Sequence, residues 1–429
     1  MGQAKNQMME EEARGFSSIG NEKVCSACFY NKGIKNFVNS NATSSHCDFC
    51  DKTDNRNNIA MPIEEVTEFI VESLLIEYDD PGNELPYDST EGGYQGDFQD
   101  LEDLLLCELQ IVEDGNSPVF KKIFEAIWDH HPIWCKKDYF GMTDSEKGRY
   151  SWEKFKNLVL RRSRYMFLKA EPVKSDYYDH WEEVSDPLQI LDSLAVYVKN
   201  LGLVKKMRIG DELYRVRLDS KDKCDTIDKI GTAPIILAKY PNRMSPAGIP
   251  MFYAANDVET AIYEIWNGKE DSVASIGKFK ILKECLIIDL SNIPAIPSIF
   301  DEEARHLRET IKFINAFVID FSKPIFKDGR EHVDYVPTQV VTEFFRYVFK
   351  YEGESIQGIC YPSSKNPGHK SYVFFWGHKD DKYTNPNLLS AWCDLNEVED
   401  KMLKSSPAII EKFNKIEEGF KRLSRIRGL

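Results

Sequence analysis

Hydrophobic residues in the first half of the chain recur at the spacing of an amphipathic helix. In PIEEVTEFIVESLL, which begins at Pro62, apolar side chains stand three and four residues apart, and the proline suits a first helical turn. The same spacing recurs in FQDLEDLLLCELQ, SPVFKKIFEAIWDHH, YSWEKFKNLVLRRSRYMF and DPLQILDSLAVYVKNLGLV. The connections are mostly short, which predicts an all-α bundle over residues 58–204.

The pattern changes in the second half of the chain. Short β-branched and aromatic runs alternate with turn residues and predict strands in ELYRVRL, GIPMFYAA, IGKFKIL, CLIIDL, IQGICYP and SYVFFW. Helical spacing interrupts them at 257–266, 300–319 and 337–349. This alternation predicts an α+β domain over residues 205–385, with a mixed or antiparallel sheet.

The last segment, residues 386–429, is predicted to be a separate helical tail. Its amphipathic stripe consists of Ile409, Ile410, Phe413, Ile416, Phe420 and Leu423. We expect this tail to pack back on the core or to pair with another chain. A homo-oligomer formed through the helical regions is therefore one expectation.

Four of the ten cysteines stand in two closely spaced pairs near the N-terminus. The pairs are Cys25 with Cys28 and Cys47 with Cys50, separated by eighteen residues. Two thiolate pairs at this spacing can close a tetrahedral zinc site, and their paired spacing favours four sulfur ligands over a set that includes His46. Because four protein ligands fill the coordination sphere, we expect a structural zinc in a ribbon-like module over residues 1–57.

Composition and charge limit the classes of partner. The chain has 429 residues, a formal net charge of −15 and a pI near 5.2. Such a surface repels nucleic acid and anionic membranes, so there is no strong nucleic-acid signal. No apolar run approaches the roughly 20 residues that span a bilayer. The polar N-terminal segment lacks the apolar core of a signal peptide, so we expect a cytoplasmic protein with reduced cysteines and no membrane partner.

Three arginines in the second half are candidates for anion binding. In ELYRVRL, alternation places Arg215 and Arg217 on one face of a strand, which is costly in a central strand unless they meet anions. Solvated arginines on an edge strand are the alternative. Arg243 lies in a turn that contains two prolines and a glycine, and such a rigid turn suits fork-like recognition of phosphate or carboxylate oxygens.

A carboxylate and two serines complete the candidate site. The helix that begins after Asp257 carries Glu264 at the boundary of its buried stripe, where a half-buried carboxylate near arginines can stabilise a developing cation. An ordinary Glu on a helix flank is the alternative. Ser363 and Ser364 follow a predicted strand without the G-x-S-x-G elbow of a serine nucleophile. We expect them to hydrogen-bond a ligand, with turn-forming serines as the alternative.

Three segments, in this order, resemble the RES domain family, which is named for an Arg, a Glu and a Ser. They are LYRVR, NRMSPAGIPMFYAANDVETAIYEI and GICYPSSKNPGHKSYVFF, and the resemblance covers residues 208–377. By this resemblance the name-giving residues are Arg215, Glu264 and Ser363. The arginine of the family's turn falls on Arg243, and its strand tyrosine falls on Tyr253.

One departure from the family pattern points to a subgroup. The usual GGRWN turn reads PNRMS in this chain, a variant that resembles RES proteins with an N-terminal HEPN-like helical domain. The predicted bundle at 58–204 would be that domain. Active HEPN ribonucleases carry an Arg followed a few residues later by a His, and no such motif stands in residues 58–200. The bundle is therefore expected to be inactive as a nuclease.

The resemblance implies an ADP-ribosyltransferase-like fold and an enzyme that consumes NAD. Members of the family act as toxins that cleave the nicotinamide–ribose bond, with phosphate or water as acceptor. The pyrophosphate would be held by Arg215 and Arg243, with Arg217 as a candidate third contact. Tyr253 would orient the nicotinamide ribose, Glu264 would stabilise the oxocarbenium-like ribose, and Ser363 and Ser364 would anchor the ribose or the phosphate.

Two alternatives to an NAD phosphorylase or glycohydrolase stay open. One is transfer of ADP-ribose to a macromolecule, and the other is a non-catalytic zinc-ribbon and helical sensor with a degenerate RES domain. An NAD-degrading enzyme also needs restraint. The expected partners are therefore an antitoxin or other regulatory protein, or the N-terminal domains acting in cis, in a toxin–antitoxin or anti-phage setting.

Overall fold

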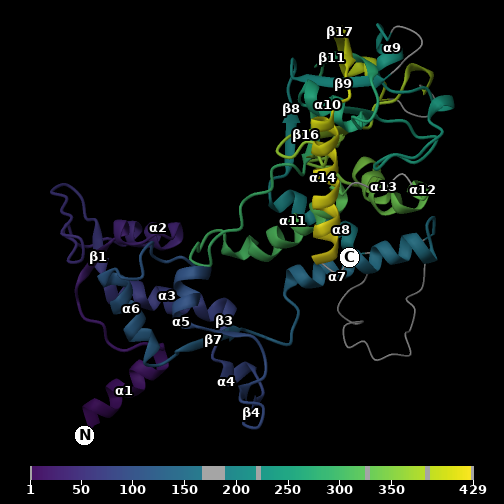
Figure 1. Cartoon of the computed structure of the whole chain (residues 1–429). Coiled ribbons are helices and arrows are strands. Elements are labelled where there is room, and N and C mark those ends of the chain that lie inside the picture. The colour runs from purple at the N-terminus through teal and green to yellow at the C-terminus, as the bar shows by residue number, and fades with distance from the viewer. Residues whose placement is uncertain (1, 167–188, 219–223, 324–328, 382–386, 427–429) are drawn as a thin grey trace. The chain divides into compact units, whose positions relative to one another are not determined.

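The computed structural model describes most of the chain, and the chain folds into two compact units (Figure 1). The described residues are 2–166, 189–218, 224–323, 329–381 and 387–426. The first unit comprises Met1–Thr143 and Ala295–Glu309, and the second comprises Asp144–Pro294 and Thr310–Leu429.

The first unit consists of helices and short strands. Its helices are α1 (Gly2–Arg14), α2 (Lys32–Ser40), α3 (Ile63–Glu77), α4 (Pro81–Glu84), α5 (Leu101–Asp103) and α6 (Pro118–Trp128). Its strands are β1 (Lys23–Cys25), β2 (Ala60–Pro62), β3 (Tyr78–Asp79), β4 (Tyr87–Asp88), β5 (Gly93–Tyr94), β6 (Phe98–Asp100) and β7 (Ile133–Lys136). Side chains cap several of these helices; for example, Asn31 accepts from the Gly33 N–H at α2, and Ser117 accepts from the Phe120 N–H at α6.

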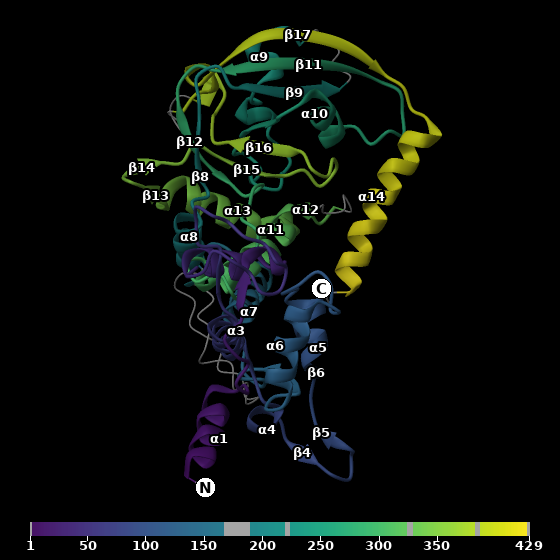
Figure 2. The same ribbon diagram turned by 90° about the vertical axis from the view of Figure 1, so that its left-hand side faces the viewer.

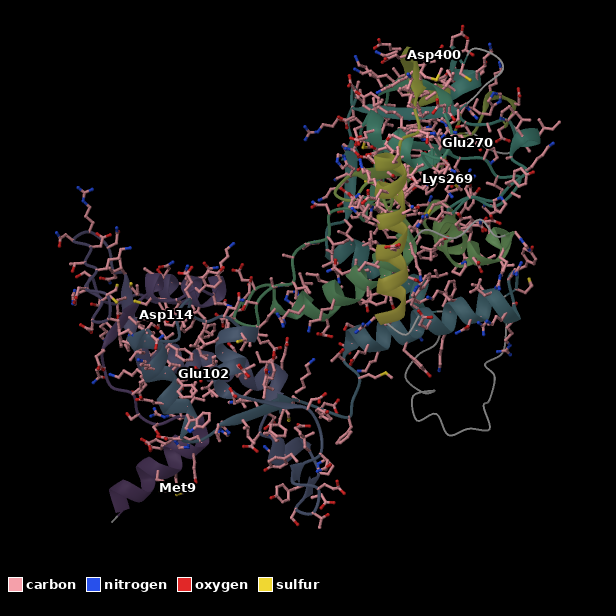
Figure 3. All side chains as sticks on the ribbon, viewed as in Figure 1. Met9, Glu102, Asp114, Lys269, Glu270 and Asp400 are labelled. Carbon is pink, nitrogen blue, oxygen red and sulfur yellow. The ribbon has the colours of Figure 1, made fainter. Side chains whose placement is uncertain are left out.

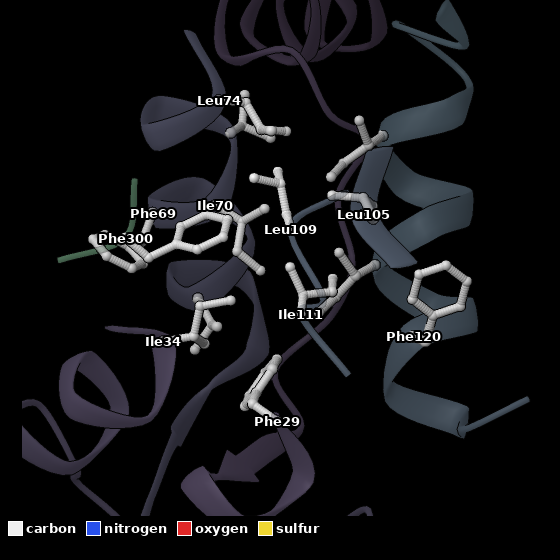
Figure 4. Packing of buried hydrophobic residues seen from close by; sticks show 14 of the residues in the cluster. Phe29, Ile34, Phe69, Ile70, Leu74, Leu105, Leu109, Ile111, Phe120 and Phe300 are labelled. Atoms are coloured by element: carbon white, nitrogen blue, oxygen red, sulfur yellow. The ribbon is translucent and has the colours of Figure 1, made fainter. Parts of the chain in front are cut away.

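One hydrophobic core joins the cysteine-containing segment to the helices that follow it. Ile34 of α2 and Ile70 of α3 are both fully buried in this core. The rings of Phe37 and Phe69 stack with centroids 3.9 Å apart. The Phe300 ring lies beside that of Phe69 (Figure 4), and their centroids are 6.1 Å apart. The cysteine-containing segment therefore depends on the same core as α3.

Part of the region predicted as a helical bundle is a small sheet. β6 pairs with β7, and β7 pairs with β3. The helix predicted for FQDLEDLLLCELQ is confined to α5 and a π-helical turn, Leu104–Glu108. Asp100 ends the strand and caps α5 by accepting from the Asp103 N–H. Short apolar runs look alike in strands and helices, so spacing alone did not separate them.

The second unit is built on a twisted sheet in which, among the described residues, eight strands are paired. Their spatial order is β17 (Cys393–Leu403), β11 (Ser272–Ile281), β9 (Glu212–Leu218), β10 (Phe252–Ala255), β16 (Lys370–Phe374), β15 (Gly358–Pro362), β12 (Cys285–Asp289) and β8 (Val204–Met207). β12 and β15 are parallel, and the other neighbours are antiparallel. The fold is α+β with a mostly antiparallel sheet, as the sequence predicted.

Figure 2 shows α14 leaving the end of β17, the strand at one edge of this sheet. The helices of the second unit are α7 (Asp144–Asn157), α8 (Gln189–Asn200), α9 (Ile227–Ile230), α10 (Val258–Ile265), α11 (Arg308–Ser322), α12 (Glu331–Asp334), α13 (Val336–Glu343) and α14 (Pro407–Ile426). A short hairpin joins β13 (Lys350–Tyr351) to β14 (Glu354–Ser355). Among the helices of the described residues, none combines the length and apolarity needed to cross a membrane.

The side chains of β9 alternate between the two faces of the sheet, as its sequence predicts. Leu213 is buried in one core cluster with Phe252, whereas Val216 is buried in another with Ile262 of α10. β9 pairs with β11 along its whole length, but it pairs with β10 at a single position, Ala255↔Tyr214, in these two fully described strands. The sheet therefore opens between β9 and β10.

Helices from before the sheet domain pack against α11 in the second unit. The Trp152 ring of α7 meets the Phe317 ring of α11 edge-on at 5.0 Å, and the Tyr197 ring of α8 meets the Phe313 ring at 5.6 Å. Residues 167–188 lie outside the described residues, so the predicted helices that include them are compared only up to Arg162 and from Gln189 onward.

The segment 386–429 is not a purely helical tail, because Cys393–Leu403 forms strand β17 of the sheet through its pairing with β11. Its helix α14 packs back on the sheet domain, which was one of the two expectations. Its Phe413 ring meets the Tyr263 ring of α10 edge-on at 5.2 Å. The loop that carries Lys269 and Glu270 lies near the start of α14 (Figure 3), and the Ser405 hydroxyl donates to the Gly268 carbonyl at 2.7 Å. The side chains of Phe420 and Leu423, two of the predicted stripe, lie outside the described part of the chain.

Candidate functional site

A cavity of about 1410 Å³ opens in the second unit, and five of the seven predicted site residues line it. They are Arg215, Arg243, Tyr253, Glu264 and Ser364. Small-molecule sites typically occupy about 300–1,000 Å³, so a dinucleotide has ample room. Ser363 and Arg217 are not among the lining residues. Instead, Ser363 donates a hydrogen bond to Glu264, and Arg217 donates one to the Gly231 carbonyl.

Glu264 stands in the last turn of α10, and two serine hydroxyls hold its carboxylate. Ser363 and Ser371 each donate to Glu264 Oε1 at 2.7 Å. The two serines are 4% and 1% exposed, so water competes little for these hydrogen bonds. With Oε1 occupied by two donors, the carboxylate is held in one orientation at the cavity wall. Asp257 fixes the other end of α10 by accepting from the Thr260 N–H.

Ser363 also organises the turn that carries it. The backbone N–H groups of Lys365 and Asn366 donate to Ser363 Oγ at 3.3 and 3.1 Å. The Asn366 side chain donates to Thr260 Oγ1 at 2.8 Å, and the Lys365 ammonium donates to the Glu264 carbonyl at 2.8 Å. The turn-forming alternative therefore describes Ser363, whose hydroxyl also orients the Glu264 carboxylate, whereas its hydrogen bond to a ligand stays a prediction.

Arg215 lies where β9 and β10 separate. Its Nε donates to the Ile230 carbonyl at 2.9 Å, and its Nη1 donates to the Tyr253 carbonyl of β10. The guanidinium thus supplies a donor to β10 where the strand ladder is interrupted. Burial lowers the pKa of Arg215 to about 9, and the charge of Arg217 acts in the same direction. The side chain stays positively charged near neutral pH.

Arg217 lies on the same face of β9 but is directed at the loop after α9. Its Nη2 donates to the Gly231 carbonyl at 2.9 Å, one residue beyond the carbonyl that Arg215 binds. Burial lowers the pKa of Arg217 as well. The two arginines therefore hold consecutive carbonyls of one loop, and the edge-strand alternative does not apply because β9 lies inside the sheet.

The turn around Arg243 is anchored to two other elements. Arg243 Nη1 donates to the Phe321 carbonyl at the end of α11, at 3.1 Å, and the Thr338 hydroxyl of α13 donates to the Arg243 carbonyl. The hydroxyl groups of Tyr253 and Ser245 share a hydrogen bond of 2.9 Å. Burial raises the pKa of Tyr253 to about 12, so this phenol is neutral near pH 7.

Sequence patterns missed several residues of this cavity. Ser371 is one, although strand alternation places it on the same face of β16 as the buried Val373. Tyr361 is another: burial raises its pKa well above the usual range, the carboxylate of Glu264 acts in the same direction, and Arg243 opposes both. A third group comes from α7 and α11, where Trp152, Lys156 and Asp320 line the cavity far from the sheet motifs.

The four predicted metal ligands converge in the first unit. Their Sγ atoms all lie within 4.8 Å of one another, with separations of 3.5 Å (Cys25–Cys50), 3.7 Å (Cys28–Cys47) and 3.9 Å (Cys25–Cys28). Zn–S bonds of about 2.3 Å in a tetrahedron put sulfurs about 3.8 Å apart, so the geometry fits. Burial raises the pKa of the Cys25 thiol to about 11, a cost that a bound dication offsets.

His46 lies outside this cluster. Its Nδ1 and the Thr53 hydroxyl share a hydrogen bond of 3.0 Å. The cluster therefore has four sulfur ligands and can hold a metal ion without any additional protein ligand.

The fold and the site define a class of protein: an α+β domain with an Arg- and Glu-lined cavity, which follows a helical region with a four-cysteine cluster. Residues 212–393 match the family model described as RES domain, and residues 40–173 match the model described as HEPN/RES N-terminal domain 1. The chain therefore contains both domains, which confirms the resemblance seen in its sequence. A RES domain suggests an NAD-related toxin or defence function. No curated protein and no solved structure matches the chain.

Proposed function

We propose that this chain degrades NAD by cleaving its nicotinamide–ribose bond, with phosphate or water as the acceptor. One observation carries the proposal: Arg215, Arg243 and Glu264, which lie far apart in the sequence, line a single cavity. A dinucleotide needs a cationic region for its pyrophosphate and an anionic group beside the sugar that becomes positively charged. The cavity offers both.

Departure of nicotinamide is the step that Glu264 would assist. The C1′–N bond breaks, its electron pair leaves with the now neutral nicotinamide, and positive charge develops on the ribose. The carboxylate, held by Ser363 and Ser371, stabilises that charge without having to reorient. An oxygen of phosphate or water then bonds to C1′. In hydrolysis the attacking water releases a proton to solvent and ADP-ribose is formed.

The remaining site residues bind and position the substrate. Arg243 contacts the pyrophosphate, assisted by the buried charge of Arg215. Tyr253 orients the nicotinamide ribose, and Ser364 donates to the ribose or to the incoming phosphate. Arg217 contributes by holding the Gly231 carbonyl, two residues before Ala233, which lines the cavity.

A direct assay tests this proposal. Purified protein is incubated with NAD, with and without inorganic phosphate, and the products are identified by mass spectrometry. ADP-ribose indicates hydrolysis, and ADP-ribose 1″-phosphate indicates phosphorolysis. Mass added to a protein or nucleic acid would instead indicate ADP-ribosyl transfer, and an unchanged NAD pool would contradict the proposal.

Glu264→Gln keeps the size of the side chain and removes its charge. We expect this variant to lose activity by about a hundredfold or more, as expected when a preorganised electrostatic contact is removed. Glu259→Gln is the matched control, because Glu259 lies on the same helix and pairs with Lys412 at the surface. Retained turnover in Glu264→Gln would refute the role of this carboxylate.

The four-cysteine cluster and the helical regions fit an effector whose NAD-degrading activity is restrained. The four-cysteine cluster is proposed to hold one structural zinc. Restraint would come from an antitoxin-like partner or from the N-terminal region in cis, and α14 or the other helices offer surfaces for self-association.

A further inference from the structure

The cavity extends beyond the sheet motifs to a wall formed by two helices. α7 contributes Trp152 and Lys156, and α11 contributes Asp320 and Phe321. α7 precedes the RES domain in the chain and lies within the segment 40–173 that matches the HEPN/RES N-terminal domain model. The site is thus not built from the RES segment alone.

Asp320 is the polar centre of this wall. Its Oδ2 accepts from Trp152 Nε1 at 2.8 Å and from Lys156 Nζ at 2.9 Å. Lys156 Nζ also forms an ion pair with Glu153 at 2.6 Å, so its positive charge does not fully neutralise the Asp320 carboxylate. In the described part of the chain no hydrogen bond is found to the second oxygen, Oδ1, and the side chain is 19% exposed.

Contacts place Arg243 between this wall and Glu264. Arg243 donates to the carbonyl of Phe321, the residue that follows Asp320 in α11. The backbone N–H of the next residue, Met244, donates to the Tyr253 hydroxyl. Tyr253 stands two residues before Ala255, whose strand partner Ser371 donates to Glu264. These contacts link Asp320 and Lys156 through Arg243 and Tyr253 to Glu264, and all five residues line the cavity.

We propose that the α7–α11 wall binds the adenosine half of NAD, with Asp320 accepting from the hydroxyls of the adenosine ribose. This inference rests on the proposed function, and it adds a subsite to it. The pyrophosphate lies in the middle of NAD, as Arg243 lies in the middle of the contacts that link Asp320 to Glu264. A carboxylate held by a buried indole and a lysine is a rigid acceptor for a pair of sugar hydroxyls. It also gives the N-terminal region a direct part in substrate binding.

Two ligands of different length test the subsite. NAD contains the adenosine half, whereas nicotinamide mononucleotide ends at the first phosphate. Binding is measured by titration calorimetry on the full chain carrying Glu264→Gln, so that turnover does not interfere. Asp320→Asn and Lys156→Met are expected to weaken NAD binding about tenfold or more, which is typical for loss of a hydrogen bond to a charged group. Binding of nicotinamide mononucleotide should stay within about twofold.

Lys154→Met is the matched control. Lys154 lies on the same helix, where its ammonium sits over the Tyr150 ring, and it does not line the cavity. It should leave the binding of both ligands unchanged. Equal losses for the two ligands in Asp320→Asn, or no loss for either, would overturn the subsite.

The outcomes for the subsite and for the reaction are separable. If the unmutated chain fails to cleave NAD but the variants lose NAD binding selectively, the adenosine subsite stands and the proposed reaction is refuted. If the chain cleaves NAD and the variants bind NAD normally, the reaction stands and the subsite is refuted.

Discussion

The hydroxyl of Ser371 donates to Glu264 Oε1 at 2.7 Å, across a separation of 107 residues in the chain. The bond joins β16 to the last turn of α10, and Ser371 is 1% exposed. Ser363 donates to the same oxygen from the turn before β16. The carboxylate is thus held by Ser363, which the family resemblance singles out, and by Ser371, which lies in the same segment but had no predicted role.

Ser371→Ala is expected to lower kcat by about tenfold or more and to change KM little. One of two hydrogen bonds to a charged group disappears, and such bonds contribute roughly 1.5–3 kcal/mol. Steady-state kinetics of NAD cleavage measure both constants. Ser390→Ala, at an exposed position of the same unit, should match the unmutated protein. A variant with full kcat would show that Ser363 alone suffices.

Arg215→Lys is expected to destabilise the second unit by roughly 2 kcal/mol. A lysine cannot reproduce the fork that reaches the Ile230 and Tyr253 carbonyls together, and a buried carbonyl is left without its donor. Urea unfolding gives the change in the free energy of unfolding. The exposed Arg208→Lys is the control. Equal stability of the two variants would exclude this role for the guanidinium.

Removal of the metal is expected to destabilise the first unit as a whole. The cysteine-containing segment shares a core with α3, so loss of the cluster exposes Ile34 and its neighbours. We expect about one zinc per chain by elemental analysis, none in Cys28→Ser, and a lower melting temperature after chelation. Cys107→Ser changes an exposed cysteine outside the cluster and should keep the metal. Full zinc content in Cys28→Ser would contradict the assignment of four cysteine ligands.

Stability at alkaline pH is expected to depend on Tyr253. Burial raises the pKa of this phenol from 10 in the unfolded chain to about 12 in the folded protein. Its contribution is fully present below pH 10 and is lost as pH rises through 12, because the unfolded state ionises first. In Tyr253→Phe, unfolding free energy should fall less steeply between pH 10 and 12. Tyr347→Phe, at an exposed position, should keep the steeper slope.

Local patterns predicted most of the sheet. All six segments predicted as strands form strands of the sheet, because each combines β-branched or aromatic residues with flanking turns. Two strands, β8 and β17, were not predicted. β17 carries many charged residues and pairs along β11, so its place in the sheet follows from its partner more than from its own composition.

Local spacing was also enough for the elements that carry the site residues. The C-x2-C pairs predicted a cluster of four cysteines, since a metal knuckle is a short-range motif. Asp257 and the stripe after it predicted α10 and placed Glu264 on its flank. Alternation in β9 placed Arg215 and Arg217 on one face. Each of these features depends on residues that are close in the chain.

The tertiary structure alone decided which of these elements meet. It brought Ser371 to Glu264, directed Arg217 toward the Gly231 carbonyl, and placed Asp320 and Lys156 at the far end of the cavity. These contacts join residues from 14 to 164 positions apart, and no periodicity within one segment encodes them. They depend on strand register and on how helices pack over the sheet, which the whole chain determines together.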